Sequence, residues 1–148
     1  MMKSRQDVNR HGQFIPNYPE KYVGKYPIVI RSSWERTFSQ WLDRNPKILQ
    51  WSSESIVVKY FDPVKNKVRR YYPDFYLLTN IGEKFIVEVK PYKETKPPTN
   101  RGNKSKKTRI YESKTWFTNQ AKFKAAVNWC DKMGMKFRIV SEKELFGK

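Results

Sequence analysis

The chain of 148 residues contains one cysteine, Cys130, and one histidine, His11. A single cysteine excludes an internal disulfide and a cysteine-rich zinc site. A single histidine excludes the histidine clusters that zinc enzymes use. Any metal ion that the protein holds must therefore be bound by oxygen ligands. Such ligands favour hard cations, so the composition indicates Mg²⁺, with Mn²⁺ as a substitute.

Long apolar segments are also missing. No apolar run approaches the length of a membrane-spanning helix, and no basic amphipathic helix stands alone as a membrane-surface anchor would. The first residues, Met1 to Asp7, include no hydrophobic stretch, so we expect no secretory signal peptide. These absences predict a protein that has no contact with a membrane.

Acidic residues are scarce: 14 Asp and Glu stand against 31 Lys and Arg, which gives a formal net charge of +17. A charge of this sign and size implies an anionic partner. The rival partner, an anionic membrane surface, has no support in the sequence, so nucleic acid is expected. The length fits one domain, residues 1–148, that can bury a core without disulfides or a structural metal.

The N-terminal residues 1–27 show neither helical nor strand periodicity and predict an extended, irregular arm. Residues 31–44 predict the first helix, because apolar residues recur there at helical spacing. Asn45-Pro46 ends this helix, since the residue before a proline disfavours helical backbone. The apolar stripe consists of Trp34, Phe38, Trp41 and Leu42.

Three β-branched segments, 55–61, 68–78 and 84–91, predict consecutive strands that are joined by tight turns. Residues 136–140 predict a last strand, which follows a second helix. The order helix, three strands, helix, strand predicts an α/β fold, in which a small mixed four-stranded sheet is flanked by helices.

Residues 93–109 are basic, include Pro97-Pro98 and carry no large apolar side chain, so we expect a flexible basic loop within the domain. Residues 115–133 predict the second helix, and Gly134 is placed to end it. The apolar face of this helix is predicted to consist of Trp116, Phe123, Val127 and Cys130.

Two of the predicted strands carry carboxylates, although charged side chains are uncommon on strands in the interior of a sheet. Asp74 follows Pro73 on the second strand, and Glu88 and Lys90 lie on the third, which is otherwise apolar on both faces. Alternate side chains of a strand share a face, so Glu88 and Lys90 point the same way. Neighbouring strands lie about 4.8 Å apart, so Asp74 and Glu88 can converge on one divalent cation. Lys90 could then orient or deprotonate a water, or neutralise charge on a phosphate.

Glu35 has two open interpretations. On the predicted helix it lies at the edge of the apolar stripe, from which its carboxylate could reach over the sheet towards the metal. Alternatively, Ser32-x-x-Glu35 forms a capping box, in which Glu35 bonds the Ser32 amide and has no catalytic role. For Glu54, which precedes the first predicted strand, a surface ion pair is favoured over a metal role.

Pro73-Asp74 and Glu88-Val89-Lys90 resemble the motif of the PD-(D/E)XK nuclease superfamily, and Glu35 is similar to the acidic residue that members often carry on their first helix. Within that superfamily, the sequence is similar across nearly its whole length to the head-completion nucleases of T-even-like tailed bacteriophages. It is more loosely similar to the endonuclease subunit of heteromeric transposases. The closer resemblance rests on Gly12-x-Phe14-x-Pro16, Lys21-Tyr22-x-Gly24, Arg31-Ser32-x-Trp34-Glu35, Trp51-Ser52-Ser53-Glu54, Arg70-Tyr71-Tyr72-Pro73-Asp74-Phe75, Glu88-Val89-Lys90-Pro91 and Asn119-Gln120-Ala121-Lys122-x-Lys124-Ala125-Ala126.

The resemblance implies a restriction-endonuclease-like fold and a metal-dependent DNA endonuclease that acts in virion assembly, when the filled head is prepared for the tail. It implies Asp74 and Glu88 as metal ligands, Lys90 as the catalytic lysine, and Glu35 as a further ligand or base. Phage portal, neck or capsid proteins would be partners, and no small-molecule organic cofactor would be needed. The host cytoplasm or the virion would be the location.

Six further polar residues are candidate DNA contacts. Gln120 and Lys122 lie on the second predicted helix, where related nucleases often place a polar residue over the phosphate; a solvated helix face is the other interpretation. In the predicted loop, basic side chains can contact phosphates without reading sequence. We expect little base specificity, because no recognition helix or base-reading module is apparent. The loop candidates are Lys104, Lys106, Lys107 and Arg109.

Two other functions stay open at this point. A structural protein that contacts DNA at the portal or neck would not need its carboxylates for cleavage. A nucleic-acid binder without enzymatic activity would show steep salt dependence and no metal dependence. The second alternative leaves Asp74 and Glu88 unexplained, because both carboxylates would repel phosphate.

Overall fold

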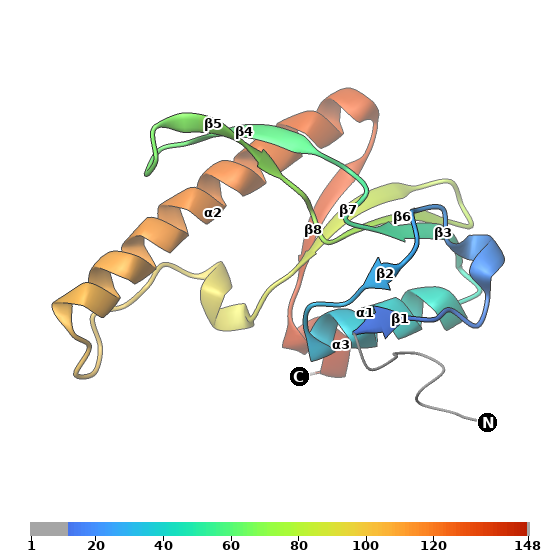
Figure 1. Ribbon diagram of the computed structural model, residues 1–148, viewed down its shortest axis with the longest axis horizontal. Helices are drawn as coiled ribbons and strands as arrows, with labels where there is room; N and C mark the ends of the chain where they lie inside the picture. The colour runs from blue at the N-terminus through green and yellow to red at the C-terminus, as the bar shows by residue number, and fades with distance from the viewer. Residues whose placement is uncertain (1–11, 148) are drawn as a thin grey trace.

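The computed structural model of the protein describes residues 12–147. Its central element is a mixed four-stranded sheet in the order β3-β6-β7-β8. β6 pairs antiparallel with both β3 and β7, whereas β8 pairs parallel to β7. Helices lie on both sides of this sheet (Figure 1). The predicted α/β class with a small mixed sheet is confirmed. The four strands are β3 (Ile48–Ser53), β6 (Phe75–Thr79), β7 (Lys84–Val89) and β8 (Lys136–Val140).

The first strand of the sheet is not the one that the sequence predicted. The segment expected at 55–61 forms β4 (Val58–Asp62), which pairs with β5 (Lys67–Tyr71) in a separate two-stranded hairpin. The expected strand 68–78 is divided into β5 and β6, because Pro73 has no amide hydrogen to donate to a strand ladder. β3, which the sequence pattern did not reveal, takes the place beside β6.

α1 (Ser33–Arg44) packs on one face of the sheet. Phe38 and Leu42 are buried there in one cluster with Trp51 of β3. The predicted apolar stripe is wrong at Trp41, whose side chain is 49% exposed and stacks on the Phe38 ring. The sheet therefore covers only part of the stripe, and Trp41 lies beside the contact rather than in it.

α2 (Lys106–Met133) packs on the other face, together with the β4–β5 hairpin (Figure 1). Phe123 and Cys130 are buried on this side, as predicted, whereas Val127 is 43% exposed. The helix ends at Gly134, which adopts the left-handed conformation that glycine tolerates. The buried partners of α2 include Val58, Tyr60 and Tyr71 of the hairpin.

The predicted loop 93–109 is shorter at both ends than the sequence suggested. A 3₁₀ turn, η3 (Tyr92–Thr95), occupies its beginning. α2 occupies its end, because the Ser105 hydroxyl accepts a hydrogen bond from the Thr108 amide and so caps a helix that starts at Lys106. The first turns of α2 extend beyond the central sheet (Figure 1).

The described part of the predicted arm is tied to the C-terminal end of α1. It contains β1 (Gln13–Phe14) and η2 (Pro19–Lys21), and β2 (Ile28–Val29), which pairs with β1, follows it directly. The Lys21 ammonium donates to the carbonyls of Leu42, Asp43 and Asn45 at 2.7, 2.8 and 2.9 Å, which satisfies carbonyl groups that a helix end leaves free. Residues 1–11 of the predicted arm, including His11, lie outside the described residues.

The chain closes with α3 (Glu142–Phe146), which begins with a complete capping box of Ser141 and Glu144. Phe146 meets the Trp34 ring of α1 edge to face. Glu142 accepts a 2.8 Å hydrogen bond from the Tyr92 amide, so α3 also anchors the segment that follows β7.

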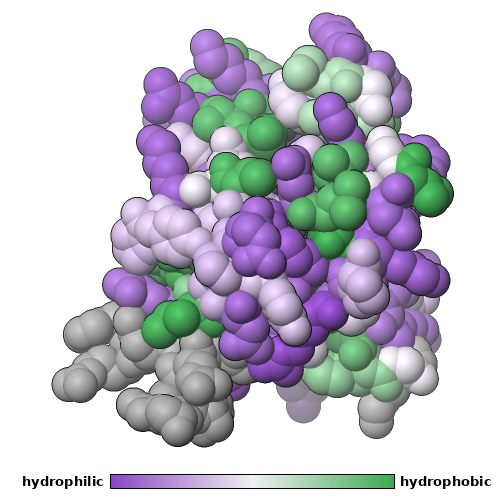
Figure 2. All heavy atoms as spheres, turned by 90° about the vertical axis from the view of Figure 1, so that its right-hand side faces the viewer, coloured by the Kyte–Doolittle hydropathy of each residue, from purple (hydrophilic) through white to green (hydrophobic). Residues whose placement is uncertain are grey.

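The surface of the described part of the chain is mixed in character. On the side that carries η2 and the β6–β7 turn, hydrophilic residues predominate and hydrophobic residues form separate patches (Figure 2). Across residues 12–147, no helix combines the length and the hydropathy that crossing a bilayer requires.

Candidate active site

Asp74 and Glu88 lie side by side at adjoining ends of two central strands. Phe75 pairs with Val87, so Asp74, one residue earlier, comes opposite Glu88 on the same face of the sheet. Oδ2 of Asp74 accepts a 2.8 Å hydrogen bond from the Val89 amide, which fixes its carboxylate against β7. The face is the one that α2 and the hairpin cover, because Glu88 pairs with Ile139 of β8 and Ile139 packs in their cluster.

Glu88 is buried, with 8% of its surface exposed, and its two oxygens have different neighbours. Oε1 accepts a 2.6 Å hydrogen bond from the hydroxyl of Tyr71 on β5. Oε2 lies 3.9 Å from Nζ of Lys90, the next residue on the same face of the strand. The carboxylate therefore stands between a neutral donor and an ammonium group.

A second group of carboxylates adjoins the first through Asp74. One carboxylate oxygen from each of Glu35, Glu54 and Asp74 lies within 4.8 Å of the others. The structure thus brings Glu35 of α1 to the end of β6 where Asp74 lies, as one of the two interpretations of Glu35 requires. Asp74 is common to this group and to the pair with Glu88.

Of the two hydrogen bonds that define a capping box, the structure has one at Ser32 and Glu35. The Ser32 hydroxyl accepts a 3.1 Å hydrogen bond from the Glu35 amide, as an N-cap should. The return bond of a capping box is replaced, because Oε1 of Glu35 accepts at 3.4 Å from the Arg31 amide rather than from Ser32. Capping the helix and facing Asp74 are therefore compatible for this side chain.

Glu54 forms the ion pair that its sequence position favoured. Arg31 donates to both of its oxygens, from Nε at 2.7 Å and from Nη2 at 3.2 Å. The backbone of Glu54 adopts a positive φ of 49°, and its amide donates to the Asp74 carbonyl at 3.0 Å. This turn after β3 is what brings the carboxylate of Glu54 so close to Asp74.

Burial raises the pKa of Asp74 well above its ordinary value, and the charge of Glu88 raises it further. The hydrogen bond from Val89 and the charge of Lys90 act in the opposite direction and do not compensate. The ionised form of Asp74 is thus short of positive charge in the protein alone.

Burial also raises the pKa of Glu88, although Tyr71, Lys90 and Lys122 all stabilise its ionised form. The pKa of Glu35 is raised by burial in the same way. Adjacent carboxyl groups with raised pKa values are the groups that a divalent cation would hold ionised, and all their ligand atoms are oxygen. The residues present fit an oxygen-bound divalent cation.

Lys122 lies next to this site, whereas Gln120 does not. The Lys122 ammonium is 5.6 Å from the ring centroid of Tyr71, and its pKa is lowered by burial and by the charge of Lys90. Gln120 is exposed and lines a groove on the other flank of α2, beside Phe137 and Ile139 of β8. Two residues apart on a helix, the two side chains point in nearly opposite directions.

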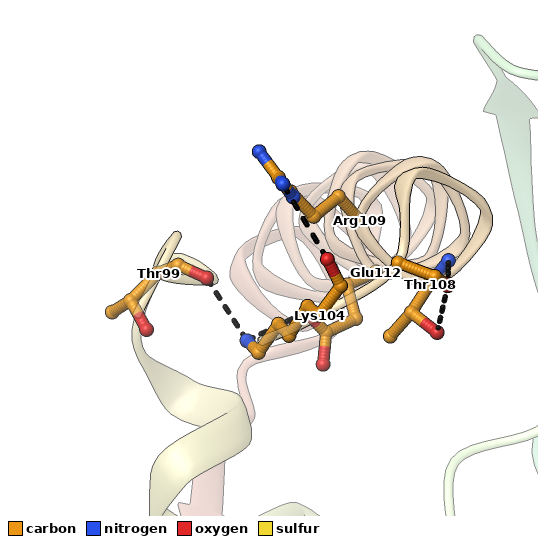
Figure 3. Close-up of polar contacts among 6 residues, drawn as sticks. Thr99, Lys104, Thr108, Arg109 and Glu112 are labelled. Atoms are coloured by element: carbon orange, nitrogen blue, oxygen red, sulfur yellow. Dashed lines mark hydrogen bonds and ion pairs between the residues drawn. The ribbon is translucent and has the colours of Figure 1, made fainter. Parts of the chain in front are cut away.

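The four basic candidates of the predicted loop differ in their surroundings. The Lys104 ammonium bonds the Thr99 carbonyl at 2.9 Å and the Glu112 carboxylate at 2.8 Å, so it ties the loop to α2 (Figure 3). Arg109 donates to the Lys104 carbonyl at 3.4 Å and is exposed. Lys106 and Lys107 are also exposed, on the first turn of α2.

Tyr71 and the proximity of Glu54 to Asp74 escaped sequence reasoning. Tyr71 stands in the run Arg70-Tyr71-Tyr72-Pro73-Asp74, next to the motif, but two adjacent tyrosines gave no means of telling the buried one from the exposed one. Glu54 could have been found only by placing β3 beside β6, and the pattern of residues 48–53 is too short to show that.

Two comparisons with known proteins agree with this geometry. A family model described as TnsA-like endonuclease N terminal matches residues 45–142, which include Asp74, Glu88 and Lys90 and leave Glu35 outside. The chain therefore belongs to the TnsA-like endonuclease family. It is also similar to the head completion nuclease of Enterobacteria phage T4, with 41% identity over 138 residues that cover 90% of this chain and 92% of that protein. No solved structure matches the chain. The predicted family resemblance and the endonuclease class are confirmed.

Replacing Asp74 with Asn should stabilise the metal-free protein increasingly as the pH rises from 5 to 8. Burial and Glu88 raise the pKa of Asp74 from 3.8 to about 8, so the folded state keeps a proton that the unfolded state releases above about pH 4. The free energy of unfolding of the wild type then falls through this window, by up to about 1.4 kcal/mol per pH unit. Urea unfolding in EDTA measures the difference between the two proteins.

The control is Glu83→Gln, which removes a carboxylate from the β6–β7 turn, where Glu83 pairs with Lys136. Its difference from the wild type should not grow with pH across the same window. If the free energy of unfolding of Asp74→Asn exceeds that of the wild type by an amount that is constant or shrinks from pH 5 to 8, the raised pKa of Asp74 is contradicted.

Proposed function

We propose that this protein is a Mg²⁺-dependent DNA endonuclease, with Mn²⁺ as a working substitute, that cuts with little sequence specificity during phage head completion. The observation that carries the proposal is the adjacent pair of a buried Glu88 and a half-buried Asp74, with Lys90 beside them in a chain of net charge +17. The endonuclease family to which the chain belongs supports the reaction class.

In this proposal Asp74 and Glu88 hold the cation, and Glu35 supplies a third ligand or acts as a base. The separation of Glu35 and Asp74 oxygens, within 4.8 Å, supports the third position. A bound divalent cation supplies an activated water and positive charge that stabilises the phosphate during in-line displacement.

Lys90 is the catalytic lysine of the proposed site. Its ammonium, 3.9 Å from Oε2 of Glu88, can donate hydrogen bonds to the attacking water or to a phosphate oxygen. Lys122 adds a second positive charge near the same carboxylate, since its charge offsets part of the rise that burial causes in the pKa of Glu88. Two ammonium groups beside the metal ligands fit a substrate whose reacting group is anionic.

Beyond the cleaved phosphate, we expect the DNA to run along the start of α2, and we call the basic residues there the proposed track. Lys106, Lys107 and Arg109 are exposed on helical turns that extend beyond the sheet (Figure 1), and phosphate contacts of this kind position a duplex without reading its sequence. Lys104 belongs to the track less directly, since its ammonium already bonds Thr99 and Glu112. Gln120, on the flank of α2 away from Lys122, is the weakest of the proposed DNA contacts.

A role in head completion follows from the relative in phage T4, whose name is head completion nuclease. Portal, neck or capsid proteins are the corresponding partners, and the host cytoplasm or the virion is the corresponding location. A purely structural role does not account for the site, because a buried Glu88 beside a half-buried Asp74 raises the free energy of a protein that makes no use of the two carboxylates.

Cleavage of supercoiled plasmid and linear duplex DNA tests the proposal. With Mg²⁺ the wild type should cut both, and EDTA should abolish cutting. Glu88→Gln should lower the rate by at least about 100-fold, because loss of a metal ligand should exceed the 10–100-fold effect of losing an outer partner of a ligand. DNA affinity, measured by fluorescence anisotropy in EDTA, should be retained in this variant.

Glu83→Gln is again the matched control, and it should cut DNA at the wild-type rate. Protein that binds DNA but does not cut it, with binding unchanged by EDTA and by Glu88→Gln, would contradict the endonuclease. It would favour a structural protein that contacts DNA in the virion.

The double variant Lys106→Ala, Lys107→Ala should bind all duplex sequences more weakly and to the same degree. Each phosphate contact contributes about 0.9 to the slope of log affinity against log salt concentration, so the slope should fall by about 2. Anisotropy titrations in EDTA at several salt concentrations measure it. Lys47→Ala, Lys84→Ala removes the same charge at the opposite end of the strands, and an equal slope change there would contradict the track.

A further inference from the structure

Tyr71 contacts a proposed metal ligand from outside the motif strands. It ends β5, in the hairpin, and its side chain is 4% exposed. Its hydroxyl and Oε1 of Glu88 are 2.6 Å apart. An ionised carboxylate only accepts hydrogen bonds, so the tyrosine hydroxyl is the donor. A bond of this length between a hydroxyl and a carboxylate belongs to the strong, charge-assisted class.

This bond makes the two oxygens of Glu88 inequivalent. Oε1 is occupied by the Tyr71 hydroxyl, whereas Oε2 faces the Lys90 ammonium at 3.9 Å. A glutamate side chain has rotatable bonds whose freedom is lost when it binds an ion, and that loss weakens binding. A carboxylate that is already held in one orientation loses less on binding. The hydrogen bond from Tyr71 therefore fixes the orientation of the Glu88 carboxylate before a cation binds.

The support of Tyr71 is itself firm. Its backbone pairs with Val58 of β4, and its ring meets the edge of Phe123 of α2 with ring centroids 6.3 Å apart. At the far end of the hairpin, the buried Asp62 accepts a 3.2 Å hydrogen bond from the Thr118 hydroxyl of α2. Helix and hairpin are thus joined at both ends of the strand that carries Tyr71.

We propose that Tyr71 is a positioning residue of the metal site, which holds the Glu88 carboxylate in the orientation that binds the cation next to Asp74. The inference rests on the proposed function, because it takes Glu88 as a ligand. Tyr71 acts through Glu88 and makes no contact with the metal or the DNA. The β4–β5 hairpin, which forms its own two-stranded sheet, thereby acquires a part in the active site.

Tyr71→Phe removes only the hydroxyl, and Tyr60→Phe is its matched control. Tyr60 is also 4% exposed, packs in the same cluster and lies under the same Lys122 ammonium. Within residues 12–147, no hydrogen bond joins its hydroxyl to a carboxylate. Isothermal titration with Mn²⁺ in the absence of DNA should give a Kd at least about 10-fold higher for Tyr71→Phe. Tyr60→Phe should match the wild type.

Cleavage kinetics supply the second readout. The Mn²⁺ concentration that gives half-maximal cleavage should rise with the Kd in Tyr71→Phe, while the KM for DNA should stay near that of the wild type. A change in KM with an unaltered metal requirement would overturn the inference, because it would place the effect of Tyr71 on DNA binding.

A double-mutant cycle separates positioning from a general loss of packing. If Tyr71 acts through Glu88, Tyr71→Phe should have no further effect on Mn²⁺ affinity in the Glu88→Ala protein. Equal effects in both backgrounds, or an unchanged Mn²⁺ affinity in the single variant, would overturn the inference and leave the endonuclease standing. Wild-type protein that binds no Mn²⁺ would overturn the proposed function and this inference together.

Discussion

Repulsion between Asp74 and Glu88 is the constraint around which the rest of the structure is arranged. Glu88 is buried and Asp74 is half-buried, and burial together with the charge of Glu88 raises the pKa of Asp74. The protein offsets part of this cost with neutral and charged donors: the Val89 amide for one group, and the Tyr71 hydroxyl and the Lys90 ammonium for the other. The remainder is what a divalent cation can compensate. In the proposed function, the metal-free protein is therefore less stable at this site than it would be without the two carboxylates, and binding of a cation offsets that cost.

Two layers deliver the partners of this pair from opposite faces of the sheet (Figure 1). On one face, α1 brings Glu35 next to Asp74 at the end of β6, and Lys21 of the N-terminal arm caps the far end of that helix. On the other face, α2 and the β4–β5 hairpin carry Lys122 and Tyr71. The sheet between these layers supplies Glu88 from β7, and the residues next to its strand ends supply Asp74, Lys90 and Glu54.

The motif and the fold class could be predicted from sequence because they depend on short-range rules. Alternation along β7 put Glu88 and Lys90 on one face, and a helical stripe and a glycine located much of α1 and the end of α2. The sequence predictions were wrong or incomplete where the pairing of strands distant in sequence determines the structure. β3 is recognisable only beside β6, and Pro73 divides what looked like one strand into two that join different sheets. Tyr71 and Glu54 reach the site through those same pairings, so no local pattern could have assigned them. Residues 106–109 carry no apolar side chain that would show helical periodicity, so the sequence pattern predicts loop where the structure has the first turn of α2.

Diffraction from crystals soaked in Mn²⁺, recorded where manganese scatters anomalously, shows directly whether Asp74 and Glu88 bind one divalent cation. An anomalous peak should lie between the two carboxylates, with oxygen ligands from both at roughly 2.1–2.2 Å, close to the 2.0–2.1 Å of Mg²⁺. The Tyr71 hydroxyl should remain bonded to the other oxygen of Glu88. A peak held by Glu35 and Glu54 without Glu88, or no peak at saturating Mn²⁺, would contradict a cation site at this pair.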